Sequence, residues 1–105
     1  MRVEKITDKE FKDALASNEK VIIKYFAGWC GSCRLFAPKF NKMSDEEEFK
    51  DVTFLDINAE ENPEARKWAG VSNLPFFAAV KNGEIVKADY TAKEESVRDM
   101  IKSLN

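Results

Sequence analysis

The sequence contains two cysteines, Cys30 and Cys33, separated by Gly31 and Ser32, and it contains no histidine. Two thiols at this spacing can exchange electrons with a disulfide, or they can form half of a zinc site. A structural zinc site needs four ligands, and the chain has no further cysteine or histidine to complete one. We therefore expect a redox-active pair without bound metal or cofactor, since the two sulfurs carry the electrons. A cluster shared between two chains is a distant alternative.

The elements around the pair favour the redox interpretation. Val21–Phe26 is rich in β-branched and aromatic residues and predicts a strand buried on both faces, which ends at Ala27 and Gly28. A helix is expected to follow. Cys30 then stands at or just before its N-terminus, where free backbone N–H groups and the helix dipole favour a thiolate. Cys33 lies about one turn further along the same side, within disulfide reach. Cys30 is thus the expected attacking thiol, and Cys33 would resolve the mixed disulfide.

The rest of the chain alternates between strands and helices. In the first half, apolar spacing predicts an extended segment around Val3–Ile6, a helix over Asp8–Ser17, the strand Val21–Phe26 and a helix after the cysteines with Pro38 inside it. The strand Val52–Ile57 and a short helix from Pro63 that Gly70 closes are expected next. The chain should then form a strand over Phe76–Val80, a hairpin at Asn82-Gly83, a strand ending near Tyr90, and a helix carrying Val97, Met100, Ile101 and Leu104. This order, β-α-β-α-β-α-β-β-α, is typical of an α/β fold with a central mixed sheet and helices on both faces. We expect one domain over residues 1–105.

Local signals predict several helix boundaries. The pattern Thr-x-x-Glu occurs before the first and the last helix, and in the second case it consists of Thr91 and Glu94. Asn62 is predicted to cap the short helix, because proline follows it at the first helical position. The charge run over residues 45–48 is interpreted as the solvated end of the helix that follows the cysteines.

Composition and charge narrow the classes of function. The chain has 105 residues, 44% hydrophobic and 34% charged, with a net charge of −2, as in a soluble globular protein. Without a basic excess we expect no nucleic-acid partner, and no apolar run is long enough to span a membrane. The lack of histidine excludes a Ser-His-Asp triad. The first residues show no signal-peptide pattern, so we expect a cytoplasmic protein; a mature secreted form whose leader has been removed stays open.

Several motifs together make the chain resemble a thioredoxin over nearly its whole length. They are Phe26-Ala27-x-Trp29-Cys30-Gly31-x-Cys33, Pro38, Asn62-Pro63, Leu74-Pro75, Lys81-Asn82-Gly83-Glu84 and the amphipathic last helix. The resemblance implies a protein-disulfide reductase that serves electron transport and cell redox homeostasis. Its partners would be disulfide-containing proteins and thioredoxin reductase, an NADPH-dependent flavoenzyme. The resemblance further implies that Trp29 flanks the site, that Pro75 is a cis-proline facing the disulfide, and that Leu74 pairs with an extended substrate segment. We expect a monomer, the default for a domain of this size.

Some positions depart from the family. Ser32 stands where thioredoxins usually have proline, and it supplies an N–H and a hydroxyl that can stabilise the Cys30 thiolate. We expect a potential less negative than the roughly −270 mV of thioredoxin, unless serine is a neutral neighbour. Phe26 stands where thioredoxins often have tryptophan, and Phe76 where they commonly have threonine. Thioredoxins also have a glycine near the position of Thr91, and this chain has none there. The substrate groove is therefore expected to have a bulkier rim, unless these are ordinary variations.

Lys24 and Asp56 form the sharpest departure. Thioredoxins carry a buried aspartate at the position of Lys24, close to the resolving cysteine, and often a lysine on the adjacent strand, where this chain has Asp56. The two charges look exchanged, which would preserve a buried pair. Three interpretations stay open. Lys24 favours the Cys33 thiolate or acts as a base, Asp56 accepts the proton of Cys33, or the lysine is structural, either paired or extended to solvent.

Three functions fit the sequence. The leading one is a thiol–disulfide oxidoreductase that reduces protein disulfides through the Cys30-Gly31-Ser32-Cys33 motif. A disulfide oxidant or isomerase on the same scaffold would differ in redox potential. A non-catalytic binding module would use the surface around Trp29 and Leu74, and its function would survive replacement of both cysteines by serine.

Overall fold

The structure is a computed structural model and describes residues 2–105. Its elements are β1 (Val3–Lys5), α1 (Asp8–Ser17), β2 (Lys20–Phe26), α2 (Gly31–Ser44), the 3₁₀ helix η1 (Glu47–Phe49), β3 (Thr53–Asn58), α3 (Pro63–Ala69), β4 (Phe76–Lys81), β5 (Glu84–Tyr90) and α4 (Glu94–Lys102). This is the predicted order of strands and helices, with η1 added. The predicted span of α1 is confirmed, whereas β3 begins and ends one residue later than expected.

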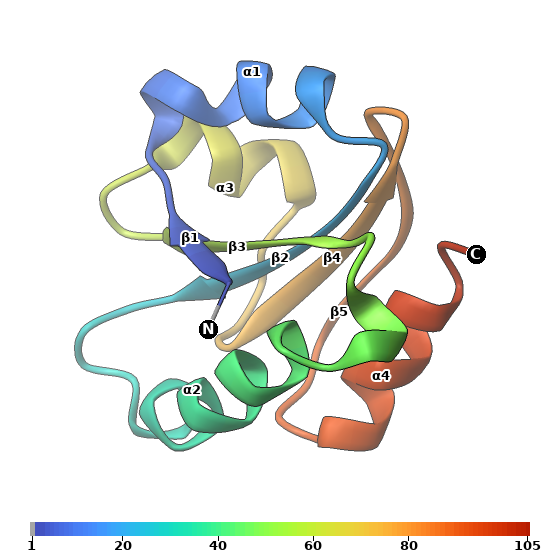
Figure 1. The fold of residues 1–105 in the computed structure, drawn as a ribbon. Coiled ribbons are helices and arrows are strands. Elements are labelled where there is room, and N and C mark those ends of the chain that lie inside the picture. Colours follow the sequence, from blue (N-terminus) through green and yellow to red (C-terminus); the bar gives the residue numbers. More distant parts are fainter. Residues whose placement is uncertain (1) are drawn as a thin grey trace.

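β2 lies at the centre of a five-stranded mixed sheet with the order β1-β3-β2-β4-β5. β1, β3 and β2 run parallel, β4 runs antiparallel to β2, and β5 runs antiparallel to β4. The helices α1 and α3 cover one face of the sheet, and α2 and α4 cover the other (Figure 1). The predicted fold, a mixed sheet between two layers of helices, is confirmed.

Alternate side chains of β2 belong to two separate cores. Val21, Ile23 and Tyr25 pack into the core beneath α1 and α3, whereas Ile22 packs with α2 and α4. Because successive side chains of a strand point to opposite faces, Lys24 shares the face of Ile22. The only charged residue in the middle of this strand is therefore directed toward α2, the helix that carries the cysteines.

The N-terminus of α3 is capped by a residue of another helix. Asp8, the first residue of α1, accepts hydrogen bonds from the backbone N–H groups of Glu64 (3.0 Å) and Ala65 (2.9 Å). Asn62 holds the predicted N-cap position, but its side chain makes no capping bond. It instead accepts the N–H of Asp8 at 2.8 Å. Tyr25 of β2 also contacts α3, because its buried hydroxyl donates to the carbonyl of Ala65 at 2.9 Å. Burial raises the pKa of this hydroxyl well above its ordinary value.

The Thr-x-x-Glu pattern caps α1 as predicted, but two other predictions at helix ends were wrong. α2 ends before the charge run, and Glu46 in that run binds Arg98 of α4 through hydrogen bonds of 2.7 and 2.6 Å. The second pattern forms no capping box, because α4 begins at Glu94 with Lys93 as its N-cap. The hydroxyl of Thr91 accepts the N–H of Lys93 at 3.1 Å instead. Both segments follow tertiary or turn contacts that compete with the local helix signal.

Replacing Asp8 by alanine should lower the free energy of unfolding by about 1–2 kcal/mol, because two backbone donors of α3 lose their acceptor. Asp13→Ala is the matched control, since Asp13 is exposed on the same helix and its side chain makes no hydrogen bond or ion pair with residues 2–105. Urea unfolding of both variants measures the effect. An Asp8→Ala variant as stable as Asp13→Ala would contradict the capping role.

Candidate functional site

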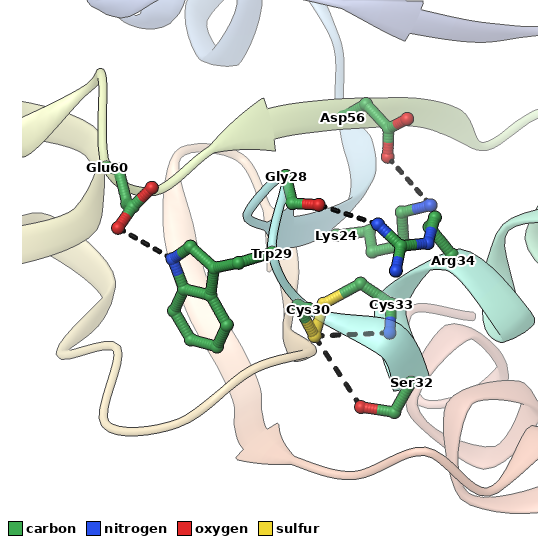
Figure 2. Close-up of a disulfide and its surroundings, with 9 residues drawn as sticks. All are labelled: Lys24, Gly28, Trp29, Cys30, Ser32, Cys33, Arg34, Asp56 and Glu60. Atoms are coloured by element: carbon green, nitrogen blue, oxygen red, sulfur yellow. Dashed lines mark hydrogen bonds and ion pairs between the residues drawn. A yellow bond between two sulfur atoms is a disulfide. The ribbon is translucent and has the colours of Figure 1, made fainter.

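Cys30 and Cys33 are joined by a disulfide at the start of α2 (Figure 2). Cys30 is the N-cap residue and Cys33 lies in the first turn, with their Cα atoms 5.3 Å apart. The backbone N–H of Cys33 donates to Sγ of Cys30 at 3.2 Å. A donor aimed at this sulfur and the positive end of the helix both stabilise a thiolate. The geometry therefore favours Cys30 as the nucleophile once the pair is reduced.

Ser32 supplies another donor to the same sulfur. Its hydroxyl oxygen lies 3.5 Å from Sγ of Cys30, and in the disulfide form the hydroxyl must be the donor, because the sulfur carries no proton. The proline usual at this position in the family would offer neither this hydroxyl nor a backbone N–H. The structure thus provides the contact through which Ser32 can stabilise a Cys30 thiolate.

The segment before β4 lies against the disulfide. Leu74-Pro75 is a cis peptide bond, as the resemblance implied, and Pro75 is buried. The side chain of Leu74 packs against Ala27 and the two cysteines. The backbone N–H and C=O of Leu74 form no hydrogen bond with other residues of the described range 2–105. An extended substrate segment could therefore pair with them.

Two side chains hold the loop between β2 and α2. Trp29 is 67% exposed, and its indole N–H donates to Glu60 Oε2 at 2.7 Å (Figure 2). Arg34 Nη1 donates to the carbonyl of Gly28 at 2.8 Å. The roles of Glu60 and Arg34 were not predicted from the sequence. No local pattern connects Glu60, two residues after β3, with Trp29, and none connects Arg34 with the carbonyl of Gly28. The exposed indole is thereby kept beside the disulfide.

Lys24 and Asp56 form a buried ion pair next to α2. The strand register places Lys24 opposite Asp56, and Lys24 Nζ lies 3.3 Å from Asp56 Oδ1 (Figure 2). Lys24 is only 2% exposed, which excludes the interpretation that it extends to solvent. Its Nζ also lies 5.3 Å from the ring centre of Phe40 and 5.9 Å from that of Phe26. These rings and the carboxylate together compensate for part of the cost of burying the ammonium group.

Asp56 shares a small cavity with Cys33. The cavity measures about 280 Å³, and Lys24 and Arg34 also line it. Asp56 Oδ1 is buried and lies at ion-pair distance from Lys24, but the contact lacks the alignment of a hydrogen bond. Burial raises the pKa of Asp56, and this effect outweighs the opposing attraction of Lys24. The resolving cysteine therefore faces a carboxylate that holds a proton more readily than an ordinary aspartate does.

Metal ligands do not gather in the described part of the chain. Residues 2–105 include no group of three or more histidine, cysteine, aspartate or glutamate side chains placed to hold a metal ion. Over the same residues, no helix combines the length and the apolar character needed to cross a membrane. The expected absence of a metal and of a cofactor stays a prediction.

The sequence and the structure of this chain were compared with those of known proteins. The sequence model of thioredoxin matches residues 2–103. The chain belongs to the thioredoxin family. It is 32% identical to Thioredoxin-1 of Schizosaccharomyces pombe, over 96% of this chain and 97% of the relative. It is 37% identical to Thioredoxin Asp f 29 of Aspergillus fumigatus, over 91% and 93%. The crystal structure of the reduced Schistosoma mansoni thioredoxin pre-protein is similar with a TM-score of 0.89 at 30% identity, over 100% of both chains.

Membership in the thioredoxin family, together with the disulfide at the start of α2, makes this protein a protein-disulfide oxidoreductase that works by dithiol–disulfide exchange. Its substrates as a class are disulfide-containing proteins. The family does not decide the compartment, because one relative, 30% identical over 87% of this chain, is the mitochondrial Thioredoxin-3 of Saccharomyces cerevisiae.

Replacing Ser32 by alanine should make the disulfide less oxidising, because the Cys30 thiolate of the reduced state loses a donor. A net hydrogen bond is worth about 0.5–1.5 kcal/mol, which corresponds to a shift of about 10–30 mV toward more negative potential. Equilibration in glutathione redox buffers measures this potential. Ser17→Ala on α1 serves as the control, since Ser17 is exposed and lies outside the site. A Ser32→Ala potential equal to that of the control would show that the serine is a neutral neighbour.

Proposed function

We propose that this thioredoxin-family protein reduces disulfides of other proteins in the cytoplasm, works as a monomer, and is recharged by an NADPH-dependent thioredoxin reductase. The observation that carries the proposal is the Cys30–Cys33 disulfide at the N-terminus of α2, with the unpaired backbone of Leu74 beside it. The reductase and its supply of electrons are inferred from the family. The net charge of −2 gives no reason to propose a nucleic-acid partner.

The reaction consists of two exchange steps. The Cys30 thiolate first attacks one sulfur of the substrate disulfide; a bond forms between the two sulfurs, the substrate S–S bond breaks, and the second substrate sulfur leaves as a thiolate that takes up a proton. The Cys33 thiolate then attacks Sγ of Cys30, which forms the intramolecular disulfide and releases the first substrate sulfur. The substrate gains two electrons and two protons in total. Two electrons from the reductase restore the dithiol.

In this proposal Trp29, Leu74 and Pro75 form the substrate-binding surface. The exposed indole of Trp29 offers an apolar contact beside the nucleophile, and Leu74 offers a backbone donor and acceptor to an extended segment. Pro75 has no N–H, so no donor of this residue competes for the sulfurs. Trp29 directly precedes Cys30, and Leu74 packs against both cysteines.

We assign proton transfer at Cys33 to Asp56, and we assign to Lys24 the role of a positioning residue. The shared cavity and the raised pKa of Asp56 support the first assignment. A charged lysine cannot accept a proton, but its ammonium group stabilises a neighbouring thiolate and fixes the carboxylate at 3.3 Å. The exchanged pair would thus keep a carboxylate near the resolving thiol, on β3 instead of β2.

Two other functions are each favoured by a single observation. The contact between Ser32 and Cys30 favours a disulfide oxidant or isomerase, because a stabilised thiolate makes the disulfide more oxidising. The exposed Trp29 favours a non-catalytic binding module. A variant with both cysteines replaced by serine separates the second of these from an enzyme, since only a binding module keeps its function.

Cys30→Ser should abolish reduction of a protein disulfide above the rate of dithiothreitol alone, because the attacking sulfur is lost. Cys33→Ser should instead accumulate a mixed disulfide with the substrate, which non-reducing electrophoresis and mass spectrometry detect. The double variant is the control and should form no adduct. A Cys30→Ser protein that reduces substrate at the wild-type rate would refute the mechanism.

Asp56→Asn and Lys24→Met should each slow resolution of the mixed disulfide by about tenfold or more, without slowing the first attack by Cys30. Asp56 accepts a proton only when it is ionised, so the wild-type resolution rate should fall as the pH decreases through its pKa. Because burial raises this pKa, the fall should begin at a higher pH than for an ordinary aspartate. The Asp56→Asn variant should lack this step in the pH profile.

Stopped-flow tryptophan fluorescence, in a Trp68→Phe background that leaves Trp29 as the only tryptophan, follows the first attack, and acid quenching followed by non-reducing electrophoresis follows the resolution. Asp51→Asn and Lys87→Met serve as controls, because both residues are exposed and lie outside the cavity. Resolution rates that match those of the controls at every pH would identify the Lys24–Asp56 pair as purely structural.

A further inference from the structure

A second, smaller cavity lies on the side of the site formed by Trp29 and Leu74. It measures about 200 Å³ and is bounded by the end of β3, by α3 and by the loop that leads to Pro75. Cavities for free ligands usually measure about 300 Å³ or more, so this one suits a single side chain. Since Trp29 and Leu74 flank the disulfide, that side chain would belong to the polypeptide whose cysteine is attacked.

Arg66 of α3 lines this cavity and has unused hydrogen-bond donors. It is half-buried, and its Nη1 donates to the carbonyl of Ala59 at 2.6 Å. The opposite edge of the guanidinium group, Nε and Nη2, donates to no residue between positions 2 and 105. This edge is the fork that binds a carboxylate through two parallel hydrogen bonds. Arg66 is therefore already oriented by Ala59 and still able to bind an anion.

The remaining lining also favours a polar occupant. Ser72 and Asn73 line the cavity, and neither side chain has a hydrogen-bond partner in the described range. An apolar side chain would cover these groups and Arg66 without satisfying them, which is unfavourable. A lysine or arginine would meet the like charge of Arg66.

Glu60 does not cancel the charge of Arg66. It lines the same cavity, but it is exposed, and its Oε2 already accepts the indole N–H of Trp29 at 2.7 Å (Figure 2). Charges exposed to solvent are screened more strongly than half-buried ones. No ion pair joins Glu60 to Arg66 within the described residues, so the guanidinium group stays available.

We propose that this cavity receives the carboxylate of an aspartate or glutamate side chain close to the reacting cysteine of a protein substrate, and that Arg66 thereby selects acidic segments. The inference rests on the proposed reduction of protein disulfides. When an extended segment pairs with the backbone of Leu74, its alternate side chains face the same way, at a spacing of about 6–7 Å. One of them enters the cavity while the cysteine sulfur stands at Cys30.

The test uses short peptides with one cysteine held in a mixed disulfide with 2-mercaptoethanol. Glutamate, glutamine or lysine is placed at successive positions on either side of the cysteine, in an otherwise neutral sequence. The wild-type protein should show a kcat/KM about tenfold higher for glutamate than for glutamine at one position, and lower for lysine. Equal values for glutamate and glutamine at every position would overturn the proposal.

Variants at Arg66 connect the preference to this side chain. Arg66→Gln should make the kcat/KM values for the glutamate and glutamine peptides equal, whereas Arg66→Glu should favour the lysine peptide. Lys67→Gln is the matched control, because Lys67 is exposed on α3 and does not line the cavity. A preference that persists in Arg66→Gln would overturn the assignment.

Further readouts separate the possible failures. Should Arg66→Gln fail to fold, Arg66→Lys keeps the charge but loses the fork, and its preference for glutamate should be reduced. An undiminished preference in Arg66→Lys would argue against paired hydrogen bonds to the guanidinium group. A protein that reduces none of the peptides contradicts the proposed function itself, whereas equal reduction of all of them contradicts only the selection by Arg66.

Discussion

The hydrogen bonding of β2 on both of its edges is the constraint on which the rest of the site depends. β3 pairs with one edge and β4 with the other, so β2 cannot shift its register without breaking both ladders. Its end leads directly to Cys30 at the start of α2. The same pairing places Asp56 of β3 opposite Lys24, and it places Leu74, which precedes β4, against the disulfide. Three chain segments thus converge on two sulfurs because one strand is paired twice.

Contacts away from the sulfurs hold these segments in place. Asp8 caps α3, and α3 leads into the loop that carries Leu74. On the other face of the sheet, Arg98 joins α4 to Glu46 in the segment after α2. Glu60 fixes the indole that flanks the disulfide. The reactive loop is therefore supported from both layers of helices, which suits a site whose cysteines must stay in fixed geometry while a large substrate binds.

In the ion pair of Lys24 and Asp56, the two charges are exchanged relative to the thioredoxin pattern, and they still compensate each other. A lone lysine on the α2 side of β2 would be a costly buried charge. Asp56 on the neighbouring strand and the ring of Phe40 compensate for it, so the pair survives with its signs reversed. The consequence for the site is that the carboxylate approaches Cys33 from β3. In the proposed mechanism, proton transfer at the resolving thiol therefore depends on a residue of β3.

The sequence by itself determined the order of elements, the place of the cysteine pair and the family. These features rest on local patterns: the apolar run of β2, the helix that follows it, and the Asn82-Gly83 turn are each encoded within a few residues. The exchange of Lys24 and Asp56 was also visible, because both positions could be compared with those of a thioredoxin.

Only the tertiary structure decided which distant residues meet. Asp8 as the cap of α3, Glu60 as the partner of Trp29, and Arg66 in the cavity beside Leu74 all join segments with no shared local pattern. Two predicted helix signals were wrong: Glu46 in the charge run binds Arg98 of α4, and Thr91 accepts the N–H of Lys93 in a local turn instead of forming a capping box. Neighbouring residues determine the short-range preferences of the backbone. Side-chain partners depend instead on how strands and helices pack, because packing brings together residues that are far apart in the chain.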